Sequence, residues 1–293
     1  MKFCYIAPTS LLPAVSEIER GFIRYKRESK AHLILAHLLD PKGPDFDESY
    51  GEWYKREDGL KILDNSAFEL YKQGRPMFDM NDLIDLGSYV KADYIVLSDY
   101  PNEPGQNTIN AAVKLAPRVR HAGFGTFFVP QSRIGDLEDY IQTFEWAVKS
   151  PLVDYIGVSI LGVPNAYGVE RDNKLQRYVS RYMMMRELQS RGLLALAKQN
   201  GKRIHFLGMV DGPKEVALVK QFDIDTWDSS APVWCGANGI RFDNTPTGLR
   251  YGKFETHVDF AAKYDTLSKV GYTEMLNDIK YNMHYLNSVI QED

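Results

Sequence analysis

Three aspartates stand at the ends of predicted strands, two of them directly after near-continuous apolar runs, where a carboxylate is well placed for acid–base or covalent chemistry. Asp64 follows the run LKIL, Asp99 follows YIVLS and Asp228 follows IDTW. A single aspartate in such a place often caps a helix or forms a turn. Three of them favour a site. Clustered carboxylates repel one another, which raises at least one pKa and prepares that group for general acid or base catalysis.

Two kinds of chemistry need several carboxylates and neither cysteine nor histidine. One is metal binding, but the six histidines show no HxH or HExxH spacing, which disfavours a zinc hydrolase. Magnesium held by carboxylates alone stays an alternative. The other is reaction at a glycosidic carbon, where one carboxylate attacks and another moves a proton. No GxSxG or reactive-cysteine motif is present, so serine or cysteine nucleophiles are disfavoured. We expect no metal and no other cofactor.

The elements that would position these residues recur with a regular spacing. Most apolar runs begin roughly 30 residues after the previous one, the length of one strand, one helix and two loops. The eight predicted strands are 3–7, 33–37, 61–64, 94–99, 126–131, 155–160, 204–209 and 226–230. Helical periodicity is clearest at 81–90, 107–119, 137–148 and 214–222. Eight such units predict an α/β fold, a (β/α)8 TIM barrel. An open doubly wound sheet is the alternative, but residues 8–13 lack its glycine-rich first turn.

Two departures from this spacing are expected within one domain covering residues 1–293. More than 40 residues separate the sixth and seventh strands, which predicts an insertion after the sixth strand. A helical segment is expected from about residue 254 to the end. Because chemistry in such barrels collects at the carboxyl ends of the strands, Asp64, Asp99 and Asp228 should share one mouth with Gln131 and Gly162.

Composition excludes some classes of protein. No run of 18 apolar residues exists, which argues against a membrane span, and the first residues read as a strand rather than a signal peptide. Cys4 and Cys235 are the only cysteines and lie far apart, so we expect a reducing cytoplasm and no disulfide framework. The formal net charge of -4 excludes a uniformly basic surface but leaves room for a local basic patch.

One segment is strongly basic. Residues 170–203 carry a net charge of +6, which leaves -10 for the rest of the chain. Arg171, Lys174, Arg177 and Arg181 recur at three- and four-residue steps, with Tyr178 among them, which predicts one helical face. Such a face suits phosphate contact and base stacking on a nucleic acid. A solvated helix face is the alternative.

The segments that follow the predicted strands resemble, in order, those of the tRNA-guanine transglycosylase family. The resemblance covers roughly residues 60–240 and is closer to the shorter phage-type relatives that place 7-deazaguanines in DNA. Residues 63–69, LDNSAFE, are similar to the family's D-S-G-G-F-Q segment, and 97–101, LSDYP, to its base-recognition loop. Residues 128–132, FVPQS, resemble its V-Q-G segment, and 160–162, ILG, its glycine-rich loop. Residues 205–210, HFLGMV, resemble the strand before the last, and 223–230, DIDTWDSS, the D-M-F-D-C segment that carries the nucleophile.

The resemblance implies a fold of the same barrel type and a base exchange with a covalent intermediate. Asp228 would attack C1′ of a target guanosine and release guanine. Asp64 would act as the general acid and base, first for the departing guanine and then for the incoming 7-deazaguanine. Asp225 is the second candidate for the nucleophile.

The same resemblance implies how the base would be recognised. Asp99 would accept hydrogen bonds from N1–H and the exocyclic amine of the base. Gln131 and the backbone of the Leu161–Gly162 segment would contact O6.

A further expectation is that Tyr100 or Phe68 stacks on the base, with packing in the core as the alternative. The chain departs from the family where Ser66-Ala67 replaces a glycine pair, where only Gly162 remains of the glycine-rich loop, and in lacking a cysteine-rich zinc site.

The partners expected from the resemblance are a nucleic acid and a free 7-deazaguanine base. DNA is favoured over tRNA, because the missing zinc site removes one feature of the tRNA enzymes. A tRNA-guanine transglycosylase is the first alternative, and a barrel hydrolase or lyase acting on a small molecule is the second. A barrel that only binds nucleic acid is a further alternative, and whether the chain forms a homodimer is left open.

Overall fold

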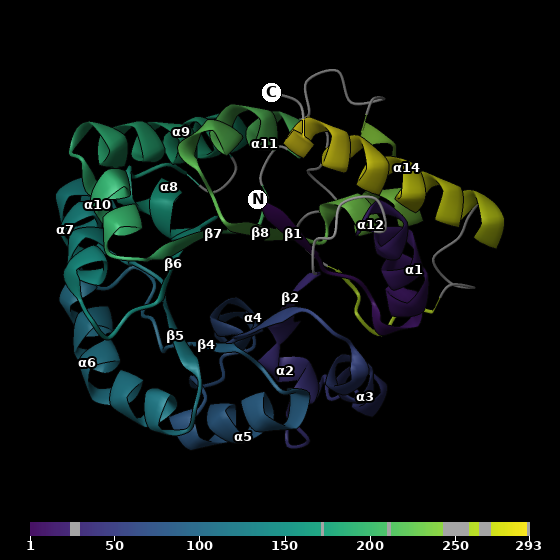
Figure 1. Cartoon of the computed structure of the whole chain (residues 1–293), viewed down its shortest axis with the longest axis horizontal. Coiled ribbons are helices and arrows are strands. Elements are labelled where there is room, and N and C mark those ends of the chain that lie inside the picture. The colour runs from purple at the N-terminus through teal and green to yellow at the C-terminus, as the bar shows by residue number, and fades with distance from the viewer. Residues whose placement is uncertain (24–29, 171–172, 210–211, 243–257, 264–270, 292–293) are drawn as a thin grey trace.

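A computed structural model describes residues 1–23, 30–170, 173–209, 212–242, 258–263 and 271–291. Eight parallel strands form a nearly closed barrel with helices outside it (Figure 1). The strands are β1 Lys2–Tyr5, β2 Ala31–Leu35, β3 Leu60–Asp64, β4 Tyr94–Val96, β5 Gly125–Phe128, β6 Tyr155–Ser159, β7 Arg203–Leu207 and β8 Thr226–Ser229. Strand β1 pairs with β8, the ladder then runs in order from β8 down to β2, and β1 packs beside β2. The predicted (β/α)8 barrel and its eight strands are confirmed.

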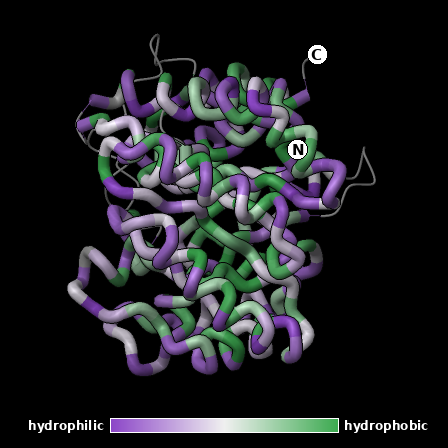
Figure 2. Tube along the Cα trace, turned by 90° about the vertical axis from the view of Figure 1, so that its left-hand side faces the viewer, coloured by the Kyte–Doolittle hydropathy of each residue, from purple (hydrophilic) through white to green (hydrophobic). Residues whose placement is uncertain are grey.

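The helices form because one face of each carries apolar residues that cover the sheet. They include α1 Leu12–Ile23, α2 Ala36–Leu39, α3 Glu48–Arg56, α4 Ala67–Lys72, α5 Met80–Val90, α6 Gly105–His121, α7 Leu137–Lys149 and α11 Pro213–Val219. Side-chain caps start several of them: Asp79 accepts a hydrogen bond from Asn81 N before α5, and Asp136 accepts one from Asp139 N before α7. Along the chain trace, hydrophobic residues gather between the elements and hydrophilic residues at the periphery (Figure 2).

The predicted insertion after the sixth strand is present. Three helices occupy it: α8 Gly162–Ala166, α9 Lys174–Ser190 and α10 Leu193–Gln199. Helices α8 and α9 pack against each other, and α10 packs on α9 and α7. Among the residues that follow β8, α12 Ala231–Ala237 is short.

The C-terminal helix begins later than expected. Of the segment expected to be helical, residues 254–257 and 264–270 lie outside the described residues, 258–263 contain a turn and no helix, and α14 runs from Tyr272 to Gln291. Helix α14 packs on α12 and also contacts α11 and α1, so it fills the helical layer between the first and last units (Figure 1). Gly236 permits this approach, because a Cβ there would lie 2.5 Å from the backbone nitrogen of Ile279.

Alternation along β7 and β8 decides which side chains line the barrel. His205 and Thr226 contact each other inside it, whereas Phe206 and Trp227 pack together toward the helices. All four side chains are almost completely buried. This alternation sets up the candidate site at the carboxyl end.

Candidate functional site at the carboxyl ends of the strands

Three carboxylates meet at the mouth of the barrel. Asp64 is the last residue of β3, Asp99 follows β4, and Asp228 lies in β8. The pKa of Asp64 is raised well above its usual value, first by burial and then by the negative charge of Glu69, with further contributions from Asp228 and Asp99. These charges therefore lie close enough to act on one another, as the strand ends predict.

A tight turn carries the chain from Asp64 into α4. Asp64 Oδ2 accepts a hydrogen bond from Ser66 N at 2.9 Å, and Asn65 Oδ1 accepts one from Ala67 N at 2.9 Å. Ser66 has φ of 54°, in the left-handed region that favours glycine. Its hydroxyl lies 3.1 Å from His37 N and 3.0 Å from His37 Nδ1, so this buried contact offsets the backbone strain.

Asp99 is held by two side-chain amides. Asn65 Nδ2 donates to Asp99 Oδ1 at 2.8 Å, and Gln131 Nε2 donates to Oδ2 at 2.6 Å. Burial raises the pKa of Asp99, and these two hydrogen bonds oppose the rise. Asn65 also donates to Leu97 O at 2.8 Å, so it ties the ends of β3 and β4 together. The sequence prediction for Asp99 and Gln131 did not include Asn65, although it directly follows Asp64.

Among the described residues, two groups hydrogen-bond to Asp228, and both contact the same oxygen. Asp228 Oδ1 lies 2.9 Å from His205 Nε2 and 3.1 Å from Gly208 N. His205 is completely buried inside the barrel. Its contact with Asp228 was not predicted. The register of β7 against β8 could have predicted this contact. His205 pairs with Thr226, and side chains that alternate along β8 place Thr226 and Asp228 on the same inner side of the barrel.

Asp225, the second candidate for the nucleophile, is misplaced for that role. It precedes β8 and lies at the amino ends of the strands, where its Oδ2 accepts a hydrogen bond from Ile204 N at 2.8 Å. Asp228 lies nearer the other end of the same strand. The prediction for Asp225 is therefore wrong, because the length of β8 separates Asp225 from the carboxylates at the carboxyl ends of the strands.

The segment after β6 differs from the expectation in its hydrogen bonds. Leu161 N and Gly162 N both donate to Ser159 Oγ at 3.1 Å, an arrangement that starts α8. The Gly162 N–H is therefore already used, and a base O6 would have to displace Ser159. Gly162 does lie beside Gln131, since a Cβ on it would meet Gln131 Oε1 at 2.9 Å.

The two aromatic candidates lie next to the carboxylates in sequence and differ in exposure. Phe68 is 37% exposed on α4, and Tyr100 is partly buried directly after Asp99. Neither is enclosed in the hydrophobic core, so both remain candidates for stacking on a base.

Arg181, one of the four residues of the predicted basic face, does not lie on the surface. Arg181 is completely buried, and its Nη1 lies 2.7 Å from Oε1 of the equally buried Glu215. It also donates to the carbonyls of Val158, Leu207 and Gly208 at 3.0–3.2 Å. The prediction that Arg181 contacts nucleic acid is wrong, because spacing cannot tell which side of α9 faces the barrel.

Other basic residues of the 170–203 segment are also engaged within the protein. Arg191 pairs with Glu138 and Glu187, and Lys198 pairs with Asp223. Arg177, partly buried, donates to Ile160 O at 3.2 Å. Lys174 begins α9, and Arg171 lies outside the described residues. Several positive charges of the segment are therefore paired with acidic residues of this chain, so its net charge of +6 overstates how much positive charge it presents to a nucleic acid.

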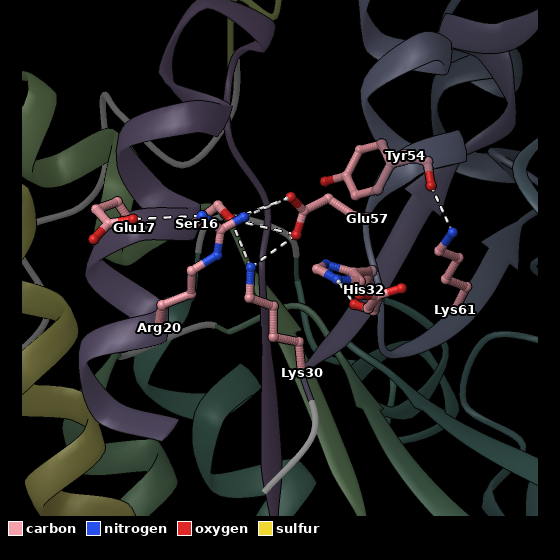
Figure 3. Close-up of polar contacts among 9 residues, drawn as sticks. Ser16, Glu17, Arg20, Lys30, His32, Tyr54, Glu57 and Lys61 are labelled. Atoms are coloured by element: carbon pink, nitrogen blue, oxygen red, sulfur yellow. Dashed lines mark hydrogen bonds and ion pairs between the residues drawn. The ribbon is translucent and has the colours of Figure 1, made fainter. Parts of the chain in front are cut away.

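A second polar cluster lies at the amino ends of the strands and serves to join elements. Lys30 Nζ lies 2.8 Å from Glu57 Oε2 and 2.5 Å from Ser16 Oγ, which ties α1 to the segments before β2 and β3 (Figure 3). Lys61 Nζ donates to the carbonyls of Tyr54 and Val90 at 2.6 and 3.1 Å. Surface depressions at this end lie away from the three carboxylates of the mouth.

The fold and this site together define a barrel with a carboxylate-lined mouth. Neither the models of known protein families nor the curated proteins include one that matches the chain. Among the described residues, no group of three or more histidine, cysteine or acidic side chains could hold a metal ion. None of the described helices is long and apolar enough to cross a membrane.

Proposed function

We propose that the protein is a base-exchange glycosyltransferase that replaces guanine in DNA with a 7-deazaguanine. The observation that carries the proposal is the contrast between Asp64 and Asp228. Asp64 has a raised pKa, which suits a proton donor, and Asp228 is a buried carboxyl group that receives a backbone N–H on Oδ1. One carboxyl group to move a proton and another to attack are what exchange at a glycosidic carbon requires.

The proposed reaction has two balanced steps. The Asp228 carboxylate forms a bond to C1′ of the target nucleotide while the bond from C1′ to N9 breaks, and Asp64 gives its proton to the departing guanine. The incoming 7-deazaguanine then loses its N9 proton to Asp64 and attacks C1′, which releases the Asp228 carboxylate. No oxidant, metal or energy source is consumed.

Asp99 would select the base. Each of its oxygens receives one amide N–H from Asn65 or Gln131, and a carboxylate oxygen can accept a second hydrogen bond. The pair of oxygens can therefore accept N1–H and the exocyclic amine of a guanine edge. A carboxylate already fixed by two amides loses little freedom on binding, which favours selectivity.

Ser66 gives independent support for the resemblance on which the substrate rests. The left-handed φ of Ser66 occurs where the resembled family has the first glycine of its pair. The turn therefore has a backbone conformation suited to glycine even though the chain has serine there.

The experiment is nucleoside mass spectrometry on cells that make 7-deazaguanine precursors and express the protein. We expect a deazaguanine deoxynucleoside in DNA that disappears with Asp228→Ala, while Asp225→Ala, which changes a carboxylate at the other end of β8, leaves it present. A modified nucleoside confined to RNA would replace DNA by tRNA as the substrate. No modified nucleoside in either pool, with purified protein also inactive on supplied base and oligonucleotide, would refute base exchange.

A further inference from the structure

One oxygen of Asp228 is occupied and the other is open. His205 Nε2 and Gly208 N both contact Oδ1, at 2.9 and 3.1 Å. In the part of the chain that the structure describes, Oδ2 has no recorded hydrogen bond. The two oxygens of the carboxylate are therefore inequivalent before any substrate binds.

His205 is held from both sides. Its Nδ1 lies 2.6 Å from Thr226 Oγ1, and the Thr226 hydroxyl lies 3.1 Å from the hydroxyl of Tyr155. The imidazole and the Phe127 ring pack in a T-shaped arrangement with ring centroids 5.4 Å apart. The ring is completely buried, so rotation about its side-chain bonds would break these contacts.

The donors and acceptors around His205 determine which ring nitrogen carries the proton. Asp228 as a carboxylate only accepts, so Nε2 must carry the hydrogen that points to Oδ1. A ring with its proton on Nε2 accepts at Nδ1 from the Thr226 hydroxyl, which requires that hydroxyl proton to turn toward Nδ1 and away from Tyr155, to which it points in the structure. Hydroxyl protons can turn to suit this arrangement, so every contact in the chain has one donor and one acceptor.

Gly208 is fixed by the layer outside the strands. Its carbonyl accepts from Arg181 Nη1 at 3.0 Å and from Trp227 Nε1 at 2.8 Å. Its φ of 69° aims the N–H at Asp228. The buried Arg181 therefore supports the second donor to the same oxygen.

We propose that His205 is a positioning residue that, with Gly208, turns Asp228 so that Oδ2 is the atom that attacks C1′. The inference rests on the proposed base exchange and adds which oxygen reacts and what aims it. In the second step the departing carboxylate regains full charge, and the Nε2–H donor stabilises that charge. His205 acts through Asp228 in both steps and touches no reacting atom.

The kinetic test compares variants in single turnover on a guanine-containing oligodeoxynucleotide, with the covalent protein–DNA adduct trapped by denaturation. His205→Leu should slow adduct formation about 100-fold, the scale of a 1 Å misplacement, with KM little changed. His205→Gln places an amide N–H near the Nε2 position and should restore the rate to within roughly tenfold of wild type. His32→Gln makes the same change in a buried histidine at the amino end of β2, where Nε2 lies 3.0 Å from Asp58 O, and serves as the control.

A second measurement tests the geometry without activity. Nitrogen-15 spectra of the histidine rings in the wild-type protein should show a proton on Nε2 of His205, and Asp228→Asn should shift that signal. A proton on Nδ1 alone would overturn the proposal, as would a His205→Leu rate within about twofold of wild type. A wild-type protein that forms neither adduct nor exchanged product would instead refute the proposed function, and the positioning role would fall with it.

Discussion

Replacing Arg181 by methionine should destabilise the protein strongly, because it leaves a charge inside the fold. Arg181 and Glu215 are both completely buried, and Nη1 lies 2.7 Å from Oε1. Removing one partner of a buried ion pair costs about 3–5 kcal/mol of the free energy of unfolding. At ~2–4 °C per kcal/mol for a chain of this size, the melting temperature should fall by roughly 10 °C.

The double variant Arg181→Met with Glu215→Leu should recover about half of that loss. It removes both charges, but the carbonyls of Val158 and Leu207 still lose the guanidinium that donates to them, at about 1 kcal/mol each. Gly208 O keeps its hydrogen bond from Trp227. A net cost near ~2 kcal/mol remains, which is less than Arg181→Met costs alone, so the two substitutions are strongly non-additive.

The assay is equilibrium unfolding in urea, followed by circular dichroism and fluorescence to check that the transitions coincide, with thermal scans alongside. Arg186→Met, an exposed position on the same helix, should change stability by less than about 0.5 kcal/mol. A cost below ~1 kcal/mol for Arg181→Met, or a double variant less stable than Arg181→Met, would refute the reasoning about the buried pair.

Three further outcomes are expected. Burial raises the pKa of Glu19 to about 8, so the stability this group contributes is present below about pH 4.5 and lost as the pH rises through 8. Glu19→Gln should therefore gain on the order of 3 kcal/mol relative to wild type between pH 5 and pH 9, and urea midpoints that differ by a constant amount would contradict this. The raised pKa of Asp64 has the same sign, so Asp64→Asn should be the more stable protein at neutral pH, with an advantage that disappears in urea titrations as the pH falls through about 4. Gly208→Ala and Gly239→Ala both place alanine at positive φ. Gly239→Ala should cost ~1 kcal/mol in thermal scans and Gly208→Ala more, because its Cβ would also lie 3.0 Å from Ile160 Cδ1. Only Gly208→Ala should slow base exchange, because its N–H contacts Asp228. Equal exchange rates in the two glycine variants would sink the assigned role of that N–H.

The mouth of the barrel was accessible to sequence reasoning because it depends on local order. Apolar runs at regular spacing predicted eight strands, and all eight are present. Since parallel strands share one direction, a polar residue after each of several strands must reach the same end of the barrel. That argument placed Asp64 and Asp99 at the carboxyl end of the barrel, where the structure has them. It failed for Asp225, because a residue that precedes a strand lies at the opposite end of the barrel.

Contacts across the barrel were not accessible in the same way. Helical spacing grouped Arg181 with Arg177, but spacing along α9 is the same whether that face meets solvent or the sheet. Only packing against β6, β7 and α11 made it the buried partner of Glu215. The hydrogen bond from Gly162 N to Ser159 Oγ likewise depends on the backbone conformation of the turn after β6, which the sequence pattern does not specify.

The sequence by itself determined the barrel, the helical insertion after β6 and the gathering of three carboxylates at one end, because these follow from periodicity and strand direction. The tertiary structure alone decided which oxygen of Asp228 is occupied, that His205 and Gly208 occupy it, and that Arg181 holds Gly208 from behind. The physical reason is distance in the chain. His205 and Asp228 are 23 residues apart, and their contact depends on register and side-chain orientation fixed only when the strands pair.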